Sequence, residues 1–235
     1  MKFLAAAALI FFVACHDKVT KTEKANPGTR IKAIESLSYF QTKHKIDSLK
    51  NQLKNDYQLG DNISQKSVLD KSKLCLLHAV SEELFEHWQG TPWDFNGIST
   101  EPKTGSIACG YFVTTVLKDA GVRLNRTRLS TVPSMIMMKE LTSSKSIRNL
   151  SALSYPEFCM LMDRQRNSLF VVGLDFHTGF IVNDGNNTWF IHSNYINRKG
   201  VVKELISDSP ALRSSRTRYI TCLTGNAFLL KWLLN

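Results

Sequence analysis

The carboxyl-terminal part of the chain consists of short apolar runs separated by polar turns, which predicts a β-sheet. Val, Ile, Phe and Trp, the residues that favour strands, are frequent in these runs. Strands are expected at residues 169–174, 178–183, 188–193, 201–206 and 218–223. The polar stretch DGNN at residues 184–187 predicts a hairpin between the second strand and the third. A terminal apolar helix at residues 227–234 is expected to cover the sheet.

Upstream of the sheet, apolar residues recur every three or four positions, which is the period of an amphipathic helix. Helices are expected at residues 29–57, 70–88, 109–120, 133–141 and 156–164. The sequence GDN at residues 60–62 separates the first two, and Ser154 is placed to cap the last. The first helix is either a spacer or a helix that packs on the domain. Helices combined with an antiparallel sheet predict the α+β class.

The amino terminus has the pattern of an export signal. Lys2 precedes an apolar run at residues 3–14 that is too short to span a bilayer, and polar sequence follows Cys15. Val13 and Ala14 before Cys15 resemble a bacterial lipobox, which implies cleavage before Cys15 and lipidation of its thiol. The alternative is an ordinary signal peptide with a chance cysteine.

Length and charge indicate how the rest of the chain is organised. A chain of 235 residues builds one sizeable domain with an additional segment. The expected divisions are a signal at residues 1–14, a tether and helical segment at residues 15–65, and one larger domain at residues 66–235. The net charge of +10 is spread along the chain and forms no dense basic block. This distribution indicates affinity for lipid headgroups or anionic envelope polymers, and it does not indicate a nucleic-acid-binding module. A monomer is expected.

Four cysteines remain after Cys15, namely Cys75, Cys109, Cys159 and Cys222. In an oxidising compartment at most one disulfide can form among them if Cys109 stays free, and the sequence does not choose the pair. The chain has no CxxC pair and no Cys/His cluster at metal-ligand spacing, so a structural zinc site is not expected.

Cys109 stands at the start of the apolar helix expected at residues 109–120. At a helix N-terminus, unpaired backbone N–H groups and the positive end of the helix dipole favour the thiolate, and they lower a cysteine pKa from about 8.5 into the range of roughly 3.5 to 7.5. Cys109 is therefore a candidate nucleophile if the helix end is open to solvent. The alternative is a structural cysteine buried between Ile107 and Phe112.

The predicted hairpin carries two histidines, and a cysteine nucleophile needs an imidazole base and a third polar group to orient it. If the residues that flank the turn pair with each other, His177 lies opposite Asn194, and His192 lies opposite Gly179. His177, His192 and Asn194 then project from one face, and Gly179 leaves room for one ring to lean toward the other. A shift of one residue would move His192 and Asn194 to the other face.

The order of these parts resembles the NlpC/P60 group of papain-like cysteine peptidases. The stretches that carry the resemblance are GTPW at residues 90–93, NG at 96–97, Cys109 at the head of a helix, GVRLNRT at 121–127, HTGFIV at 177–182 and FIH at 190–192. They cover roughly residues 88 to 195. The chain departs from the family pattern at Ala108, where Asp is usual, and at Trp93, where Tyr is usual.

The resemblance implies a papain-like α+β fold in which the nucleophile helix packs on an antiparallel sheet. It implies Cys109 as the nucleophile, His177 as the base and His192 as the orienting residue, with Asn194 as the alternative in that last role. The implied substrate is a peptide bond in peptidoglycan stem peptides, and the mechanism requires no metal or organic cofactor. The alternatives are an amidase or acyltransferase that acts on a lipid or another amide, and a non-catalytic envelope lipoprotein with the same fold.

Together with the lipobox, the resemblance implies a lipid-anchored protein of the cell envelope that faces the periplasm or the exterior. Trp93 is expected to form a wall of the cleft beside Cys109, and Asn194 projects from the histidine face. Arg126 either meets a carboxylate of an acidic stem peptide or belongs to a solvated basic face. Backbone N–H groups at the start of the Cys109 helix are expected to bind the oxyanion.

Overall fold

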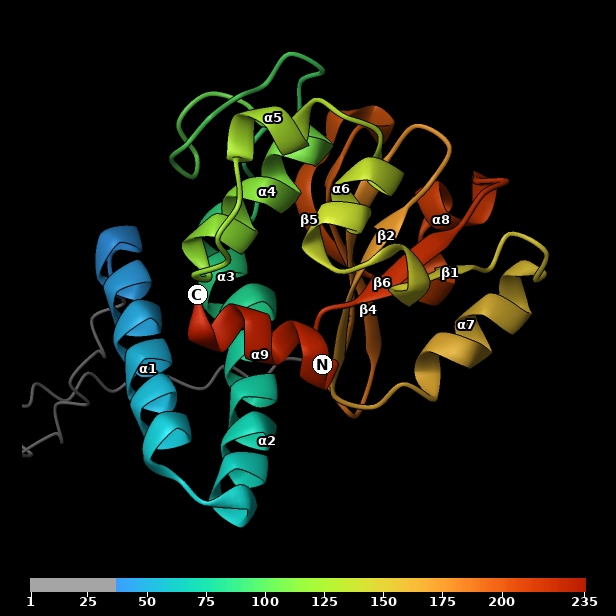
Figure 1. Ribbon diagram of the computed structural model, residues 1–235. Coiled ribbons are helices and arrows are strands. Elements are labelled where there is room, and N and C mark those ends of the chain that lie inside the picture. The colour runs from blue at the N-terminus through green and yellow to red at the C-terminus, as the bar shows by residue number, and fades with distance from the viewer. Residues whose placement is uncertain (1–36) are drawn as a thin grey trace, which may run out of the picture. The chain divides into compact units, whose positions relative to one another are not determined.

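The computed structural model describes residues 37–235 (Figure 1), so the predicted signal, Cys15 and the tether lie outside the described residues. The helices are α1 (Tyr39–Leu59), α2 (Asn62–His78), a π-helical turn (Ala79–Glu83), α3 (Leu84–Trp88), α4 (Cys109–Asp119), α5 (Arg126–Ser130), α6 (Ser134–Leu141), α7 (Tyr155–Asp163), α8 (Pro210–Ser214) and α9 (Asn226–Leu234). The strands are β1 (Ile147–Asn149), β2 (Ser168–Gly173), β3 (Thr178–Asn183), β4 (Thr188–Asn194), β5 (Gly200–Leu205) and β6 (Tyr219–Cys222). Short 3₁₀ turns lie at Ser144–Ser146, Ile196–Arg198 and Ile206–Asp208.

The strands form one antiparallel sheet in the order β1-β6-β2-β3-β4-β5. The five predicted strands are present close to their expected positions, and the α+β class is confirmed. At the β3–β4 hairpin Asn183 pairs with Thr188 and Phe180 with Ile191, which is the predicted register. Strand β1 was not predicted, because it is only three residues long and lies in a polar region.

The helices predicted within residues 109–164 correspond to α4, α6 and α7. Helix α7 begins after Ser154, which forms a capping box with Glu157. The helix predicted to begin at residue 70 begins instead at Asn62, directly after Asp61, whose side chain accepts a hydrogen bond from the backbone of Ser64. The start of this helix was predicted too far along the chain, because the first two turns of α2 are mostly polar and show no apolar residues at helical spacing. No helix among the described residues combines the length and apolar content needed to cross a bilayer.

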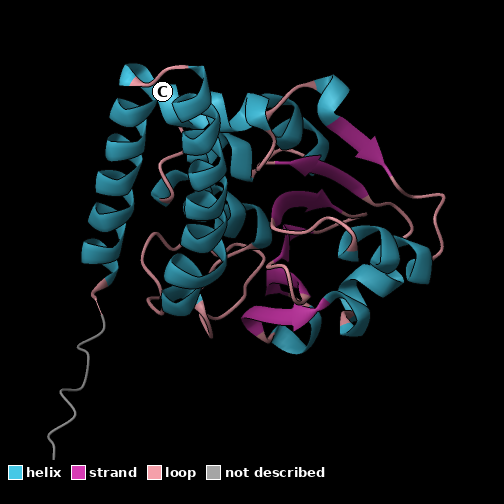
Figure 2. Cartoon of the chain, turned by 90° about the horizontal axis from the view of Figure 1, so that it is seen from below, coloured by secondary structure: helices cyan, strands magenta, loops and turns pink. Residues whose placement is uncertain are grey.

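Helices cover both faces of the sheet (Figure 2). Alternate residues of each strand face opposite layers, so Val171 of β2 belongs to the core that includes α2, α4 and α9, whereas Val172 belongs to the core that includes α7 and α8. Gly173 of β2 comes so close to Ser134 of α6 that a β-carbon there would lie 2.2 Å from Ser134 Oγ. The sheet is therefore a middle layer, and its strands read as continuous apolar runs because both faces are buried.

Helix α1 packs on the rest of the described chain, which settles whether this helix is a spacer. Ile46 is only 1% exposed within the core. Trp88 Nε1 donates a hydrogen bond to Tyr39 Oη at 2.8 Å, and Lys50 Nζ donates to the backbone oxygen of Gly121 at 2.8 Å. Residues 37–235 accordingly form one compact unit.

Candidate active site

The start of α4 is fastened to the β3–β4 hairpin. Cys109 is the first helical residue of α4. Ala108 is the N-cap of α4, and the backbone oxygen of the residue before it, Ile107, accepts a hydrogen bond from Ser193 Oγ at 2.6 Å. Phe112 of α4 meets Phe180 of β3 edge to face, with ring centroids 6.1 Å apart. These contacts hold the start of α4 beside β3, which His177 directly precedes, and β4, which contains His192.

Cys109 lies partly buried between the start of α4 and the start of β3. Burial raises the pKa of its thiol, and hydrogen bonding from the backbone N–H groups of Thr178, of Gly110 and of Cys109 itself lowers the pKa by less. The N–H groups at the helix start act in the expected direction, but the expected net lowering of this pKa is wrong, because desolvation outweighs them. The sulfur therefore lies next to the backbone of Thr178, the residue that directly follows His177 in the chain.

His177 and His192 are in direct contact. His177 Nε2 lies 2.7 Å from His192 Nδ1, and the ring centroids are 4.9 Å apart. His177 is 6% exposed and His192 is fully buried. The two rings share a face of the hairpin, as the predicted register requires. Nδ1 of His177 is the nitrogen that remains for a further partner.

Gly179 makes this contact possible. An ideal β-carbon at Gly179 would lie 2.6 Å from Phe190 Cε2 and 2.8 Å from His192 Cβ. The Phe190 ring stacks on His192, with centroids 4.0 Å apart and planes inclined by 21°. The absence of a side chain at Gly179 therefore lets both rings lie over β3.

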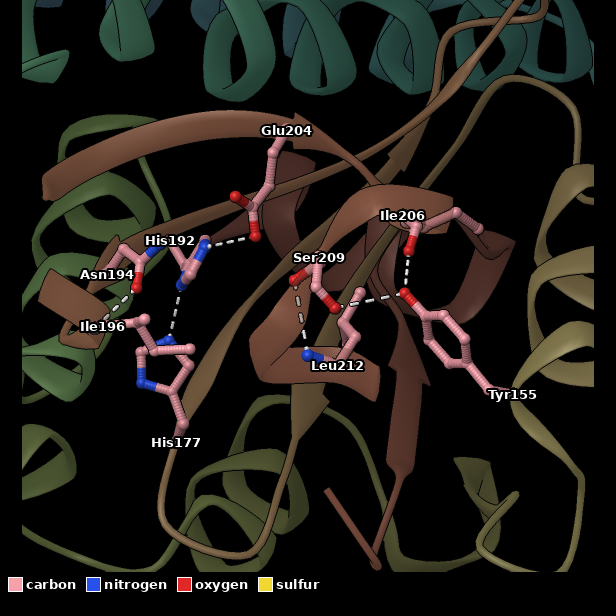
Figure 3. Close-up of polar contacts among 9 residues, drawn as sticks. All are labelled: Tyr155, His177, His192, Asn194, Ile196, Glu204, Ile206, Ser209 and Leu212. Carbon is pink, nitrogen blue, oxygen red and sulfur yellow. Dashed lines mark hydrogen bonds and ion pairs between the residues drawn. The ribbon is translucent and has the colours of Figure 1, made fainter. Parts of the chain in front are cut away.

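A glutamate from the next strand completes the group. Glu204 of β5 places Oε1 3.2 Å from His192 Nε2, so that His177, His192 and Glu204 follow one another in a line of polar contacts (Figure 3). Strand β5 pairs His192 with Val202, which makes Glu204 a diagonal neighbour of His192 on the same face. The sequence reasoning missed Glu204. Its only signal was a charged residue inside a predicted strand, and the β4–β5 register that gives it meaning is a tertiary property.

Burial controls the charges in this group. It lowers the pKa of His177 well below 6.5, and the neighbouring His192 lowers it further. Burial also lowers the pKa of His192, although the contact with Glu204 acts in the opposite direction. For Glu204, burial raises the pKa, but hydrogen bonding from His192 and Ser209 outweighs burial and the net shift is downward. At neutral pH the group therefore holds two neutral imidazoles and one carboxylate.

Two of the residues expected to bind substrate lie near the histidines. The Trp93 ring packs on Tyr195 with centroids 6.3 Å apart, and Tyr195 in turn meets His177 edge to face at 5.1 Å. Asn194 Oδ1 accepts a hydrogen bond from the backbone N–H of Ile196 at 2.8 Å, so this side chain is used in the turn after β4 (Figure 3). Trp93 thus belongs to an aromatic group beside His177, and its role in binding stays a prediction.

Arg126 lies on the other side of α4 and holds the loop that precedes this helix. Its Nε donates to Thr115 Oγ1 at 2.6 Å, and Nη2 donates to the backbone oxygens of Ser99 at 2.7 Å and Ile98 at 3.0 Å. The guanidinium also lies 4.8 Å from the ring centre of Tyr111. These contacts occupy much of the donor capacity of the side chain, and its binding of substrate stays a prediction.

The site is therefore assembled from the thiol at the start of α4, the imidazole of His177 directly before β3, the imidazole of His192 in β4 and the carboxylate of Glu204 in β5. The other cysteines of the described chain, Cys75, Cys159 and Cys222, are free thiols and form no disulfide. Comparison with protein-family models, with curated proteins and with solved structures finds no match to this chain. A thiol beside an imidazole that is itself held by a second polar group is an arrangement suited to nucleophilic catalysis.

Proposed function

We propose that this protein is an exported cysteine hydrolase with a papain-like fold of the NlpC/P60 type, and that it cleaves amide bonds in peptidoglycan stem peptides. The observation that carries the proposal is the buried contact between His177 Nε2 and His192 Nδ1 at 2.7 Å, beside the helix start that bears Cys109. Burying two imidazoles costs desolvation free energy that an apolar pair would avoid. Such a cost is typical of functional sites.

In the proposed reaction, Nδ1 of His177 accepts the thiol proton while the Cys109 sulfur attacks the amide carbonyl carbon. The resulting imidazolium gives this proton to the leaving amine, and a thioester remains. His177 then takes a proton from water, whose oxygen attacks the thioester and releases a carboxylic acid and the regenerated thiol. Backbone N–H groups at the start of α4, including that of Cys109, stabilise the oxyanion in both steps.

The resting site contains a neutral thiol and a neutral imidazole, because burial raises the pKa of Cys109 and lowers the pKa of His177. The proton therefore moves during the attack, and His177 acts as a general base. This differs from a site that stores a thiolate and an imidazolium before the substrate arrives. It also protects the thiol from alkylation and oxidation, which require the thiolate.

The contacts support His192 over Asn194 as the residue that orients His177. His192 lies within hydrogen-bond distance of the base, whereas the Asn194 side-chain oxygen is used by the backbone of Ile196. The support for peptidoglycan is of another kind. It comes from the resemblance in sequence, the lipobox-like residues before Cys15 and the net charge of +10, which suits an anionic envelope polymer.

One observation favours a second candidate, an amidase or acyltransferase whose substrate carries an apolar chain. Phe176, the residue before His177, is 98% exposed, and Tyr195, which packs on His177, is 40% exposed. Apolar side chains exposed beside a reactive centre are suited to contact with an acyl chain. The chemical steps at Cys109 would be the same, and only the group bound beside the site would differ.

The decisive experiment incubates the full chain, purified in detergent, with purified peptidoglycan and analyses the released fragments by mass spectrometry. We expect the wild-type protein to release peptides, Cys109→Ala to release none, and Cys159→Ala, which removes a thiol from α7, to behave as the wild type. Equal product from Cys109→Ala would refute the nucleophile assignment. Cleavage of a fatty-acyl amide but not of peptidoglycan, lost in Cys109→Ala, would favour the second candidate.

A further inference from the structure

We infer that Glu204 is a positioning residue that sets the tautomer of His192 and, through it, the tautomer of His177. The geometry behind this inference is the line of contacts from Glu204 Oε1 to His192 Nε2, at 3.2 Å, and from His192 Nδ1 to His177 Nε2, at 2.7 Å (Figure 3). The tautomers follow from these contacts together with the ionised state of Glu204, whereas their catalytic value rests on the proposed function of Cys109.

The direction of each hydrogen bond follows from the carboxylate. An ionised carboxylate only accepts hydrogen bonds, so His192 Nε2 must carry the proton in its contact with Glu204. A neutral imidazole has one donor nitrogen and one acceptor nitrogen, so His192 Nδ1 is an acceptor. His177 Nε2 is then the donor in the second contact, and the lone pair of His177 Nδ1 is left available. That nitrogen is the one that must accept the thiol proton of Cys109.

Burial prevents other arrangements. His192 is fully buried, so water cannot replace Glu204 as the acceptor. The Phe190 ring stacks on His192 and also meets His177 edge to face, with centroids 6.0 Å apart, which restrains both imidazole planes. Burial lowers the pKa of both histidines, so that each keeps a single ring proton at neutral pH. Only the acceptor at Glu204 decides which nitrogen of His192 holds it.

Glu204 is itself fixed as an ionised acceptor. It comes from β5, whose register against β4 pairs Phe190 with Glu204, and its side chain is only 17% exposed. Hydrogen bonding from Ser209 and His192 keeps its pKa below the usual glutamate value despite burial. The neighbouring residue on β5, Lys203, pairs with Glu82 at 2.6 Å instead. Removal of Glu82 is therefore a matched control, because it breaks an adjacent ion pair of β5 without touching His192.

The test is NMR of the full chain with ¹⁵N-labelled histidine at neutral pH, because long-range ¹H–¹⁵N correlations distinguish the two tautomers of each ring. We expect protons on Nε2 of both His177 and His192 in the wild type and in Glu82→Gln. Glu204→Gln keeps this pattern, because its amide oxygen still accepts from His192. Glu204→Leu has no acceptor, and we expect the proton of His192 to move to Nδ1 and that of His177 to follow.

Hydrolysis by the same variants supplies the catalytic readout. Glu204→Leu is expected to lose about 10²-fold or more in rate, which is the share that general-base catalysis contributes. Glu204→Gln is expected to stay within about tenfold of the wild type, because a neutral acceptor forms the same hydrogen bond with less strength. A structural role for Glu204 would lower the rate of both variants without moving the ring protons.

Three results would overturn the inference. The first is a wild-type His192 protonated on Nδ1, and this measurement needs no variant and no folding control. The second is a Glu204→Leu protein whose ring protons match those of the wild type. The third is a Glu204→Gln protein that matches Glu204→Leu in spectrum and rate. Failure of the proposed function is seen separately, as equal hydrolysis by the wild type and Cys109→Ala. In that case the tautomer measurement still decides what Glu204 does to His192.

Discussion

Replacement of Gly179 by alanine tests whether the close approach of β3 and β4 builds the site. The new β-carbon would lie 2.6 Å from Phe190 Cε2, 2.8 Å from His192 Cβ and 2.9 Å from the backbone oxygen of Ile191. Carbon atoms in favourable contact are separated by about 3.5–4.0 Å. The two carbon neighbours must therefore retreat by roughly 0.7–1.4 Å, and the third neighbour is a backbone oxygen that cannot rotate away.

The cost is at the upper end of the range for overpacked cores. Extra methyl groups in a packed interior cost about 1–3 kcal/mol, and Phe190 and His192 are both fully buried. We expect Gly179→Ala to lower the free energy of unfolding by about 2–3 kcal/mol. We also expect the retreat of His192 to lengthen its contact with His177, and hydrolysis to slow by about 10²-fold, as misplacement by about 1 Å does elsewhere.

Urea unfolding followed by tryptophan fluorescence measures the first effect, and peptide release from peptidoglycan measures the second. Gly225→Ala is the matched control, because nothing lies within 4 Å of its new β-carbon. Gly225 caps α9, so the weaker cap of alanine and the lower entropy of its unfolded chain nearly cancel, within about 1 kcal/mol. If Gly179→Ala unfolds and hydrolyses like the wild type, the strands are not packed as closely as the reasoning requires.

Three further predictions concern the helices, the histidines and the loop before α4. Ile46→Ala is expected to destabilise the protein by about 2–5 kcal/mol, because Ile46 is 1% exposed in the core. The control is Leu49→Ala, one turn further along α1, which should cost less than about 1 kcal/mol because Leu49 is 38% exposed. Equal urea midpoints for the two variants would mean that α1 is not packed on the domain. Burial lowers the pKa of His177 and His192, so unfolding takes up protons below about pH 6.5. The free energy of unfolding should therefore fall between pH 7.5 and pH 5 by up to about 1.4 kcal/mol per pH unit for each histidine. The same slope in a variant with glutamine at both positions would contradict this. Arg126→Gln removes the hydrogen bonds that tie the loop to α4, so limited proteolysis should cut this loop faster than in the wild type, and unchanged cleavage would show that other contacts hold it.

The sequence determined those features that depend on neighbours along the chain. Helix period, the cap at Ser154 and the break at Gly60 arise from contacts within four residues, so each could be read without a fold. The DGNN turn set the register of β3 and β4 because a hairpin joins residues that are close in sequence. That local register is sufficient to place His177 and His192 on one face.

The more distant groups that meet this face are brought there by tertiary packing. Glu204 reaches His192 through the pairing of β4 with β5, and the start of α4 reaches the hairpin through the bond from Ser193 to Ile107. Neither contact follows from a periodicity. Packing also reversed the expected pKa shift of Cys109, because the extent of burial depends on everything that surrounds the thiol. Local pattern thus indicates the candidate groups Cys109, His177 and His192, whereas desolvation and long-range pairing set their protonation, because both depend on the complete fold.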